Sequence, residues 1–169
     1  LEIAKANGAR YLFTSSSEVY QTADVIPTPE TYVGAISSVE DRSCYDVSKL
    51  MGENLSFVYW KEFGVNTGSV RLFNSFGPGL GESDYRILPR IASSIVSGVP
   101  LKVFRNKRMP TRTYCFAANT IAGIVLALVN GKSGEIYNIG SNSPELDIEQ
   151  LIKRINVATG YSVGYEIVD

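Results

Sequence analysis

The sequence predicts an α/β fold built on a largely parallel sheet. Short apolar runs alternate with helical segments along the chain, glycine follows several of those segments, and no repeat or low-complexity tract interrupts the alternation. A chain of 169 residues can form one domain with its own core, or part of a larger domain.

The first half of the chain alternates in this way around one long irregular segment. Residues 21–43 hold Pro27, Pro29 and Gly34 and few periodic apolar positions, which is typical of a functional loop. The elements expected around it are a helix end at 1–6, a buried strand at 10–15, a helix from Tyr45 to about Gly64, and a strand at 66–73 that ends before Gly77.

The second half continues the alternation with shorter elements. Gly98 and Gly140 follow a helix and a strand respectively, and Asn119 and Asp147 are candidate N-caps of two helices. The expected elements are a helix at 88–96, a strand at 101–104, a helix beginning at Asn119, a strand at 135–140 and a helix at 148–157.

Composition argues against several classes of function. The chain carries 16 basic and 17 acidic residues without a long run of either sign, which argues against binding to nucleic acid or a membrane surface through charge. It has no histidine, and Cys44 and Cys115 form no paired motif, so we expect no metal. The apolar runs are too short to span a bilayer and no signal-peptide pattern opens the chain, so a cytoplasmic location is expected.

The first residues suggest that the chain is a piece of a longer one. Leu1 stands first, Met51 is the first methionine, and residues 1–6 read as the end of a helix already under way. We therefore expect further sequence before Leu1.

Tyr45 and Lys49 are the pair with the clearest chemical potential. Four residues apart on a helix, their side chains leave the same face about one turn apart, so the ammonium can favour the phenolate form of the tyrosine. Such a tyrosine can move protons near neutral pH. Taken alone, the pair could equally be an ordinary surface pair on an amphipathic helix.

A hydroxyl cluster ends the strand expected at 10–15. Ser15, Ser16 and Ser17 are followed by Glu18, and open α/β sheets bind ligands at the carboxyl ends of their strands. The irregular segment that follows would bring this cluster close to Tyr45. Serines in such a place often only cap or turn the chain.

These stretches together resemble the extended short-chain dehydrogenase/reductase family, the NAD-dependent nucleotide-sugar epimerases, dehydratases and decarboxylases. The resemblance runs over nearly the whole chain, and any one of its motifs would be weak without the others. In order, they are Ser16-Ser17-Glu18-Val19-Tyr20, Tyr45 with Lys49, Arg71-Leu72-Phe73-Asn74-Ser75-Phe76-Gly77-Pro78, Thr111-Arg112-Thr113-Tyr114-Cys115-Phe116, and Tyr137-Asn138-Ile139-Gly140.

The resemblance implies the C-terminal part of an NAD(P)-binding, Rossmann-like doubly wound sheet, with a small substrate-binding lobe. Residues 1–75 would form the second half of the sheet and residues 76–169 most of the lobe that binds the sugar nucleotide. It implies NAD as cofactor, a UDP- or dTDP-linked sugar as substrate, and a homodimer formed partly by the helix after Tyr45.

Within the family, the chain is most similar to UDP-glucuronate decarboxylases. The similar positions are Ser17-Glu18 before Val19-Tyr20, Pro29-Glu30-Thr31-Tyr32 with Gly34, Arg42-Ser43-Cys44-Tyr45-Asp46, and Arg86. The dTDP-glucose 4,6-dehydratases rank second and the 4-epimerases third.

The resemblance also implies roles for individual residues. Tyr45, Lys49, Ser16 and Glu18 would be catalytic, and Tyr45 and Lys49 would also contact the cofactor. Ser75 and Arg86 would be further cofactor contacts, whereas Ser17, Asn74 and Arg112 would bind the substrate. The plainer alternatives are that Arg112 is a surface charge and that Asn74 only satisfies loop backbone.

Some expected features depart from the family pattern or are missing. Gln21 stands where glycine usually follows the Val-Tyr pair, and the segments 104–107 and 117–119 also differ from the family. The family's glycine-rich phosphate loop is not among these residues, so we expect the 169-residue chain alone to bind NAD weakly and to be inactive. The alternative of another class is a non-catalytic remnant that binds a sugar nucleotide or a partner.

Overall fold

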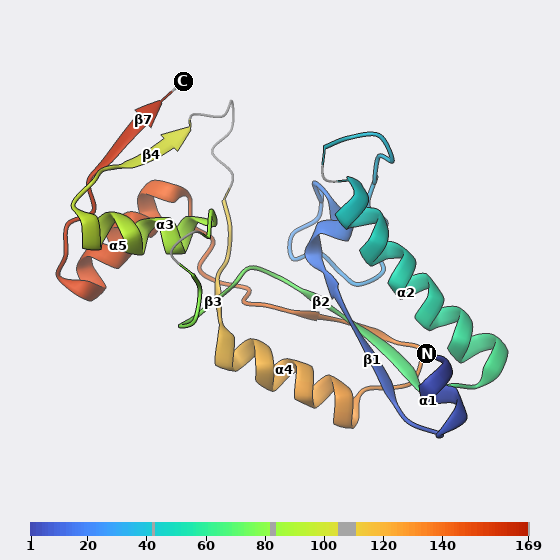
Figure 1. Ribbon diagram of the computed structural model, residues 1–169. Coiled ribbons are helices and arrows are strands. Elements are labelled where there is room, and N and C mark those ends of the chain that lie inside the picture. Colours follow the sequence, from blue (N-terminus) through green and yellow to red (C-terminus); the bar gives the residue numbers. More distant parts are fainter. Residues whose placement is uncertain (42, 82–83, 105–110, 169) are drawn as a thin grey trace. The chain divides into compact units, whose positions relative to one another are not determined.

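The computed structural model describes residues 1–41, 43–81, 84–104 and 111–168 (Figure 1). The chain forms two compact units, the first made of Leu1–Ser75 and Cys115–Asn142 and the second of Phe76–Tyr114 and Ser143–Asp169. Arg42 and most of the departure at 104–107 fall outside the described residues.

The first unit is built on a three-stranded parallel sheet. Its strands, in the spatial order β1-β2-β6, are β1 (Tyr11–Ser16), β2 (Thr67–Leu72) and β6 (Ile136–Ile139). Ser16 pairs with Leu72, which pairs with Ile139, so the three strands end at one edge of the sheet. That edge is where a parallel sheet presents a ligand site.

Helices cover both faces of this sheet. Helix α2 (Ser43–Phe63) lies on one face and α4 (Ala117–Asn130) on the other (Figure 1). The unit also contains α1 (Glu2–Ala6) and the 3-10 helix η1 (Ser17–Tyr20). The short strands β3 (Ser75–Phe76) and β5 (Cys115–Phe116) pair where the chain leaves and re-enters the unit.

The two faces of the sheet differ in chemistry. Val70, Ala127 and Ile139 form an apolar core on the α4 side. On the other face, the side chains of α2 that become buried are polar, namely Ser43, Asp46, Glu53 and Ser56. The apolar residues whose spacing predicted α2, such as Leu50 and Met51, are exposed. The helix is therefore held to the sheet largely by polar contacts.

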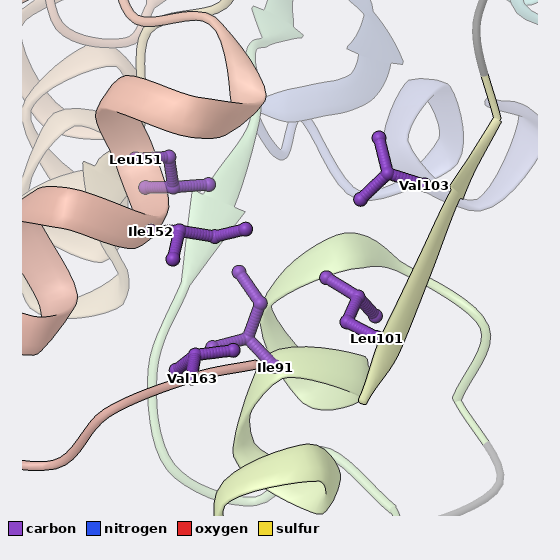
Figure 2. Packing of buried hydrophobic residues seen from close by; sticks show 6 residues of the cluster. All are labelled: Ile91, Leu101, Val103, Leu151, Ile152 and Val163. Carbon is purple, nitrogen blue, oxygen red and sulfur yellow. The ribbon is translucent and has the colours of Figure 1, made fainter. Parts of the chain in front are cut away.

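The second unit packs two helices against a pair of parallel strands. Its elements are α3 (Ile87–Ser97), β4 (Leu101–Phe104), α5 (Ile148–Thr159) and β7 (Tyr165–Val168), with β4 and β7 in parallel register. Figure 2 shows the buried side chains of its core, which are Ile91, Leu101, Val103, Leu151, Ile152 and Val163.

The expected α/β class with parallel sheets is confirmed, and so is the cap at Asp147. The Asp147 carboxylate accepts from the Gln150 backbone at 2.8 Å, and the Gln150 side chain accepts from the Asp147 backbone at 3.1 Å. The cap expected at Asn119 is wrong, because α4 begins at Ala117 with Phe116 as N-cap. Alanine is the strongest helix former, so two alanines extend the helix past the expected start.

Three short strands and η1 were not expected from the sequence. Among the described residues, no helix is long and apolar enough to cross a membrane.

Candidate active site

The hydroxyl cluster lies where β1 ends and η1 begins. Ser16 is the last residue of β1 and is buried, and its Oγ accepts a hydrogen bond from the Glu18 backbone at 3.2 Å as the N-cap of η1. Ser17 is half-buried and Glu18 is exposed. Ser15 is 3% exposed, and its Oγ has no hydrogen-bond partner among the described residues. The cluster thus has both a structural hydroxyl and a carboxylate open to a ligand.

Tyr45 and Lys49 stand in the first turns of α2, on the face predicted by their spacing. The Lys49 Nζ lies 5.5 Å from the centroid of the Tyr45 ring and 5.5 Å from that of Phe13. It donates a hydrogen bond of 2.9 Å to the Thr14 carbonyl, two residues before Ser16. Lys49 therefore reaches from the helix to β1, while the Tyr45 ring stays 41% exposed.

A second contact joins the two halves of the site. Gln21, directly after η1, donates a hydrogen bond of 2.7 Å from Nε2 to Oδ2 of Asp46. Asp46 follows Tyr45 in the chain and is 6% exposed. This bond and the Lys49 bond tie the hydroxyl cluster to the start of α2.

Deeper in the first unit, a buried ion pair joins α2 to β2. Arg71 Nε and Nη2 donate to the two carboxylate oxygens of Glu53 at 2.9 and 2.7 Å, and the two residues are 7% and 5% exposed. Burial by itself lowers the pKa of Arg71, but the hydrogen bonds and charge of Glu53 and Tyr20 raise it above the ordinary value for arginine. The guanidinium therefore stays charged inside the unit.

The same arginine anchors the irregular segment. The Arg71 Nη1 donates to the Glu30 carbonyl at 2.8 Å, and the guanidinium carbon lies 4.6 Å from the centroid of the Tyr20 ring. The Tyr20 hydroxyl donates to Asn138 Oδ1 at 2.7 Å, and the Asn138 amide donates to the Thr28 carbonyl at 2.9 Å. This network holds the segment and η1 against β2 and β6.

Asn74 and Ser75 follow the end of β2. The Asn74 carbonyl accepts from the Cys115 backbone at 2.8 Å, and the Asn74 residue is exposed. The Ser75 Oγ shares a hydrogen bond of 2.8 Å with the Thr120 hydroxyl and donates to the Phe73 carbonyl at 3.2 Å. Because β1 and β2 are parallel, these residues leave the same edge of the sheet as the hydroxyl cluster.

Arg86 and Arg112 belong to the second unit. Arg86 is the N-cap residue of α3, its side chain is 58% exposed, and it is paired with Asp84 at 2.5 Å. The hydrogen bonds from Arg86 lower the pKa of Asp84 to about 2. Arg112 is exposed, and its backbone exchanges hydrogen bonds with that of Leu146. Its side chain donates from Nη1 to the Thr111 carbonyl at 2.8 Å.

Of the nine residues predicted for the site, seven lie in the first unit and two in the second. Four further residues hold the first unit's part of the site together, and the sequence predicted no such role for them; they are Gln21, Asp46, Glu53 and Arg71. Glu53 stands four residues after Lys49, and this continuation of the helical spacing was a usable signal. The described residues contain no group of three or more side chains of the kinds that hold a metal ion.

Comparison with known proteins identifies the family to which this chain belongs. The model of the NAD dependent epimerase/dehydratase family matches residues 1–140. The chain belongs to this family.

Among curated members of the family, UDP-glucuronic acid decarboxylase 3 of Arabidopsis thaliana is 31% identical over 169 residues, which is 100% of this chain and 48% of that protein. The chain thus spans about half the length of the curated relatives it matches.

Solved structures of the family share the fold. The UDP-glucuronic acid 4-epimerase from Bacillus cereus, in complex with UDP-glucuronic acid and NAD, matches with a TM-score of 0.78 and 25% identity over 95% of this chain and 48% of that one. The dTDP-glucose 4,6-dehydratase DesIV from Streptomyces venezuelae matches with a TM-score of 0.79 and 24% identity over 99% of this chain and 51% of that one.

Proposed function

We propose that these residues are part of an NAD-dependent enzyme that oxidises the sugar of a nucleotide sugar at C4, and that its reaction is the decarboxylation of UDP-glucuronate. The observation that carries the proposal is that Lys49 of α2, beside the Tyr45 ring, donates a hydrogen bond to the Thr14 carbonyl, two residues before the buried Ser16. The similarity to UDP-glucuronic acid decarboxylases over the whole chain favours this reaction within the family.

In the proposed reaction, Tyr45 as phenolate takes the proton of the C4 hydroxyl. Bound NAD would accept the hydride from C4. The resulting C4 ketone lies β to the C6 carboxylate, so the electron pair of the breaking bond to carbon dioxide can pass to the carbonyl oxygen. Lys49 would place its positive charge beside the reacting groups, since its Nζ lies 5.5 Å from the centroid of the Tyr45 ring.

Ser16 and Glu18 are proposed to work on the same sugar. Ser16 would hydrogen-bond the C4 oxygen and polarise the ketone, which requires its hydroxyl to serve the ligand as well as the η1 cap. Glu18 is exposed and would, with Ser17, orient the sugar or handle protons around the loss of carbon dioxide.

The residues present fit the nicotinamide side of a bound NAD. Lys49, one turn after Tyr45 on α2, donates to the Thr14 carbonyl of β1, and Ser75 follows the carboxyl end of β2. The buried Ser15 Oγ is a hydroxyl without a partner among the described residues. Arg86 is proposed as a further contact. We propose that the 169-residue chain alone binds NAD weakly and does not turn over, and a calorimetric titration that gives submicromolar binding would contradict this.

Asn74 and Arg112 are proposed to hold the nucleotide diphosphate, because an amide and a guanidinium both suit phosphate oxygens. In this proposal residues 1–75 supply the second half of the cofactor-binding sheet, and residues 76–169 supply most of the lobe that binds the sugar nucleotide.

We also propose that the protein forms a homodimer through α2. Val47, Leu50, Met51 and Phe57 on this helix are between 40% and 56% exposed. They line one wall of an open cavity of about 530 Å³, whose other wall comes from the starts of β2 and β6. Apolar side chains exposed along one helix are typical of an interface.

The test is a substrate panel with the full-length protein that carries these residues. Incubation with UDP-glucuronate, dTDP-glucose or UDP-glucose, followed by chromatography that separates sugar epimers and by mass spectrometry, is expected to show loss of carbon dioxide from UDP-glucuronate alone. Dehydration of dTDP-glucose or epimerisation of UDP-glucose would point to the runner-up reactions. No conversion of any of the three would support a non-catalytic remnant and contradict the proposal.

A further inference from the structure

Gln21 has a backbone conformation that side chains disfavour. Its φ of 54° and ψ of −127° lie in a region that glycine adopts readily and other residues adopt at a cost. Among the residues that the structure describes, Gln21 is the one non-glycine residue with a positive φ. Such a conformation persists where neighbouring contacts hold it, so the contacts of Gln21 show what it does.

Those contacts join η1 to α2. The Gln21 backbone donates to the Glu18 carbonyl at 3.0 Å, which closes η1. The Gln21 side chain turns to α2 and donates from Nε2 to Asp46 Oδ2 at 2.7 Å. The residue therefore spans from the carbonyl of Glu18 to the side chain that follows Tyr45.

The buried carboxylate of Asp46 is stabilised by this hydrogen bond from Gln21. It is 6% exposed, and its Oδ1 has no hydrogen-bond partner among the described residues. A nearly buried carboxylate is costly without donors, although its place in the first turn of α2 offsets part of the cost. The Gln21 amide thus stabilises Asp46, and Asp46 in turn holds Gln21 in its strained conformation.

We infer that Gln21 and Asp46 form a clamp that positions Glu18 of η1 relative to Tyr45 of α2. Gln21 is a positioning residue, since it acts through these two neighbours. The inference rests on the proposed function in that it assigns the clamp a purpose in the reaction. Its geometry stands on the hydrogen bonds of Gln21 alone.

Two substitutions separate the bond from the strain. Gln21→Ala removes the bond and keeps a residue that disfavours positive φ, whereas Gln21→Gly removes the bond and relieves the strain. We expect amide hydrogen exchange at residues 18–21 to be about tenfold to hundredfold faster in Gln21→Ala, because a hydrogen bond to a charged group is lost. Gln21→Gly is expected to be more stable than Gln21→Ala. Gln150→Ala, in the capping box of α5, is the matched control and should leave exchange at 18–21 unchanged.

The purpose of the clamp is tested in the full-length protein. Gln21→Ala and Gln21→Gly are both expected to lower kcat for UDP-glucuronate by about tenfold to hundredfold with little change in KM, because misplaced catalytic groups slow the chemical step more than binding. Both are also expected to shift the ring carbon NMR signal of Tyr45, assigned with Tyr45→Phe.

The outcomes are separable. Unchanged exchange at 18–21 in Gln21→Ala, or an unchanged Tyr45 signal, would overturn the clamp whether or not the protein is active. Faster exchange with an unaltered kcat in an active enzyme would overturn its positioning role. A wild-type protein that converts no nucleotide sugar would refute the proposed function, while a shifted Tyr45 signal would still support the clamp.

Discussion

Replacing Glu53 by alanine should be among the most damaging single changes in the first unit. Glu53 accepts two hydrogen bonds from Arg71, at 2.9 and 2.7 Å, and the two residues are 5% and 7% exposed. Glu53→Ala leaves a guanidinium buried with its remaining contacts at the Glu30 carbonyl and the Tyr20 ring. Arginine does not shed its proton to relieve this, because a guanidinium keeps its charge in proteins at neutral pH.

The size of the effect follows from the cost of an unpaired buried charge. Removal of one partner of a buried ion pair costs about 3–5 kcal/mol. The free energy of unfolding of a domain of this size is roughly 5–15 kcal/mol. For most values in that range, Glu53→Ala would remove a third or more of it. Replacing both residues, as in Glu53→Leu with Arg71→Met, removes the charge together with its partner and should restore most of the loss.

Urea unfolding of the purified chain, followed by circular dichroism, measures these differences. Ser56→Ala is the control, because Ser56 is 2% exposed on the same face of α2 and loses only its hydrogen bond to the Gly52 carbonyl, worth about 1 kcal/mol. A loss below about 1 kcal/mol in Glu53→Ala, less than a single neutral hydrogen bond, would refute the reasoning. So would a double variant that is less stable than Glu53→Ala.

Three further predictions concern other parts of the chain. Gly52→Ala should lower the free energy of unfolding by about 1–3 kcal/mol despite the better helix propensity of alanine, because the added Cβ would lie 2.1 Å from the Phe13 ring. An increase in the urea midpoint would contradict this and show that the ring moves aside. Asp147→Ala should cost about 1 kcal/mol by removing the cap of α5, and Asp147→Asn should recover most of it; equal midpoints for wild type and Asp147→Ala would contradict this. The NMR signal of the Asp84 carboxyl carbon should titrate with a midpoint near pH 2, so the stabilisation from its pair with Arg86 is present above the ordinary aspartate pKa and is lost as pH falls through about 2. Arg86→Gln should return the titration midpoint to the ordinary aspartate value. A wild-type midpoint at the ordinary aspartate value would exclude the pair in solution.

The sequence was sufficient to place α2 but not to orient it. Its apolar residues recur with a helical period, and so do Asp46, Lys49, Glu53 and Ser56, because any face of a helix repeats in that way. The general rule that apolar faces turn inward points to Leu50 and Met51, yet the polar face contacts the sheet. The reason is that the hydrogen-bond partners of this polar face come from distant parts of the chain.

The same limit applies to the candidate site. Tyr45 and Lys49 are four residues apart, so their proximity follows from local geometry, and the end of a parallel strand fixed the place of the hydroxyl cluster. The contact of Arg71 with Glu30 joins residues 41 positions apart, and no local pattern encodes it. The Gln21–Asp46 contact spans 25 positions and depends on a backbone conformation that glutamine rarely adopts.

Short elements escaped prediction for a different reason. Strands β3 and β5 have two residues each, which is too few for an alternation of apolar and polar side chains to appear. Helix α4 was expected from its apolar spacing, but its start depended on whether Asn119 or the preceding alanines would dominate. The helix propensity of the alanines prevailed, and Phe116 became the N-cap.

The proposed reaction depends on proton transfer by the hydroxyl of Tyr45, and one substitution removes that hydroxyl alone. Turnover of UDP-glucuronate by the full-length protein should fall by at least about 100-fold in Tyr45→Phe, since a positioned acid–base group contributes about 10²–10⁴-fold to the rate. The phenylalanine ring can still pack where the tyrosine ring lies, so circular dichroism should be unchanged. Turnover that survives at the wild-type rate in a folded Tyr45→Phe protein would contradict the account.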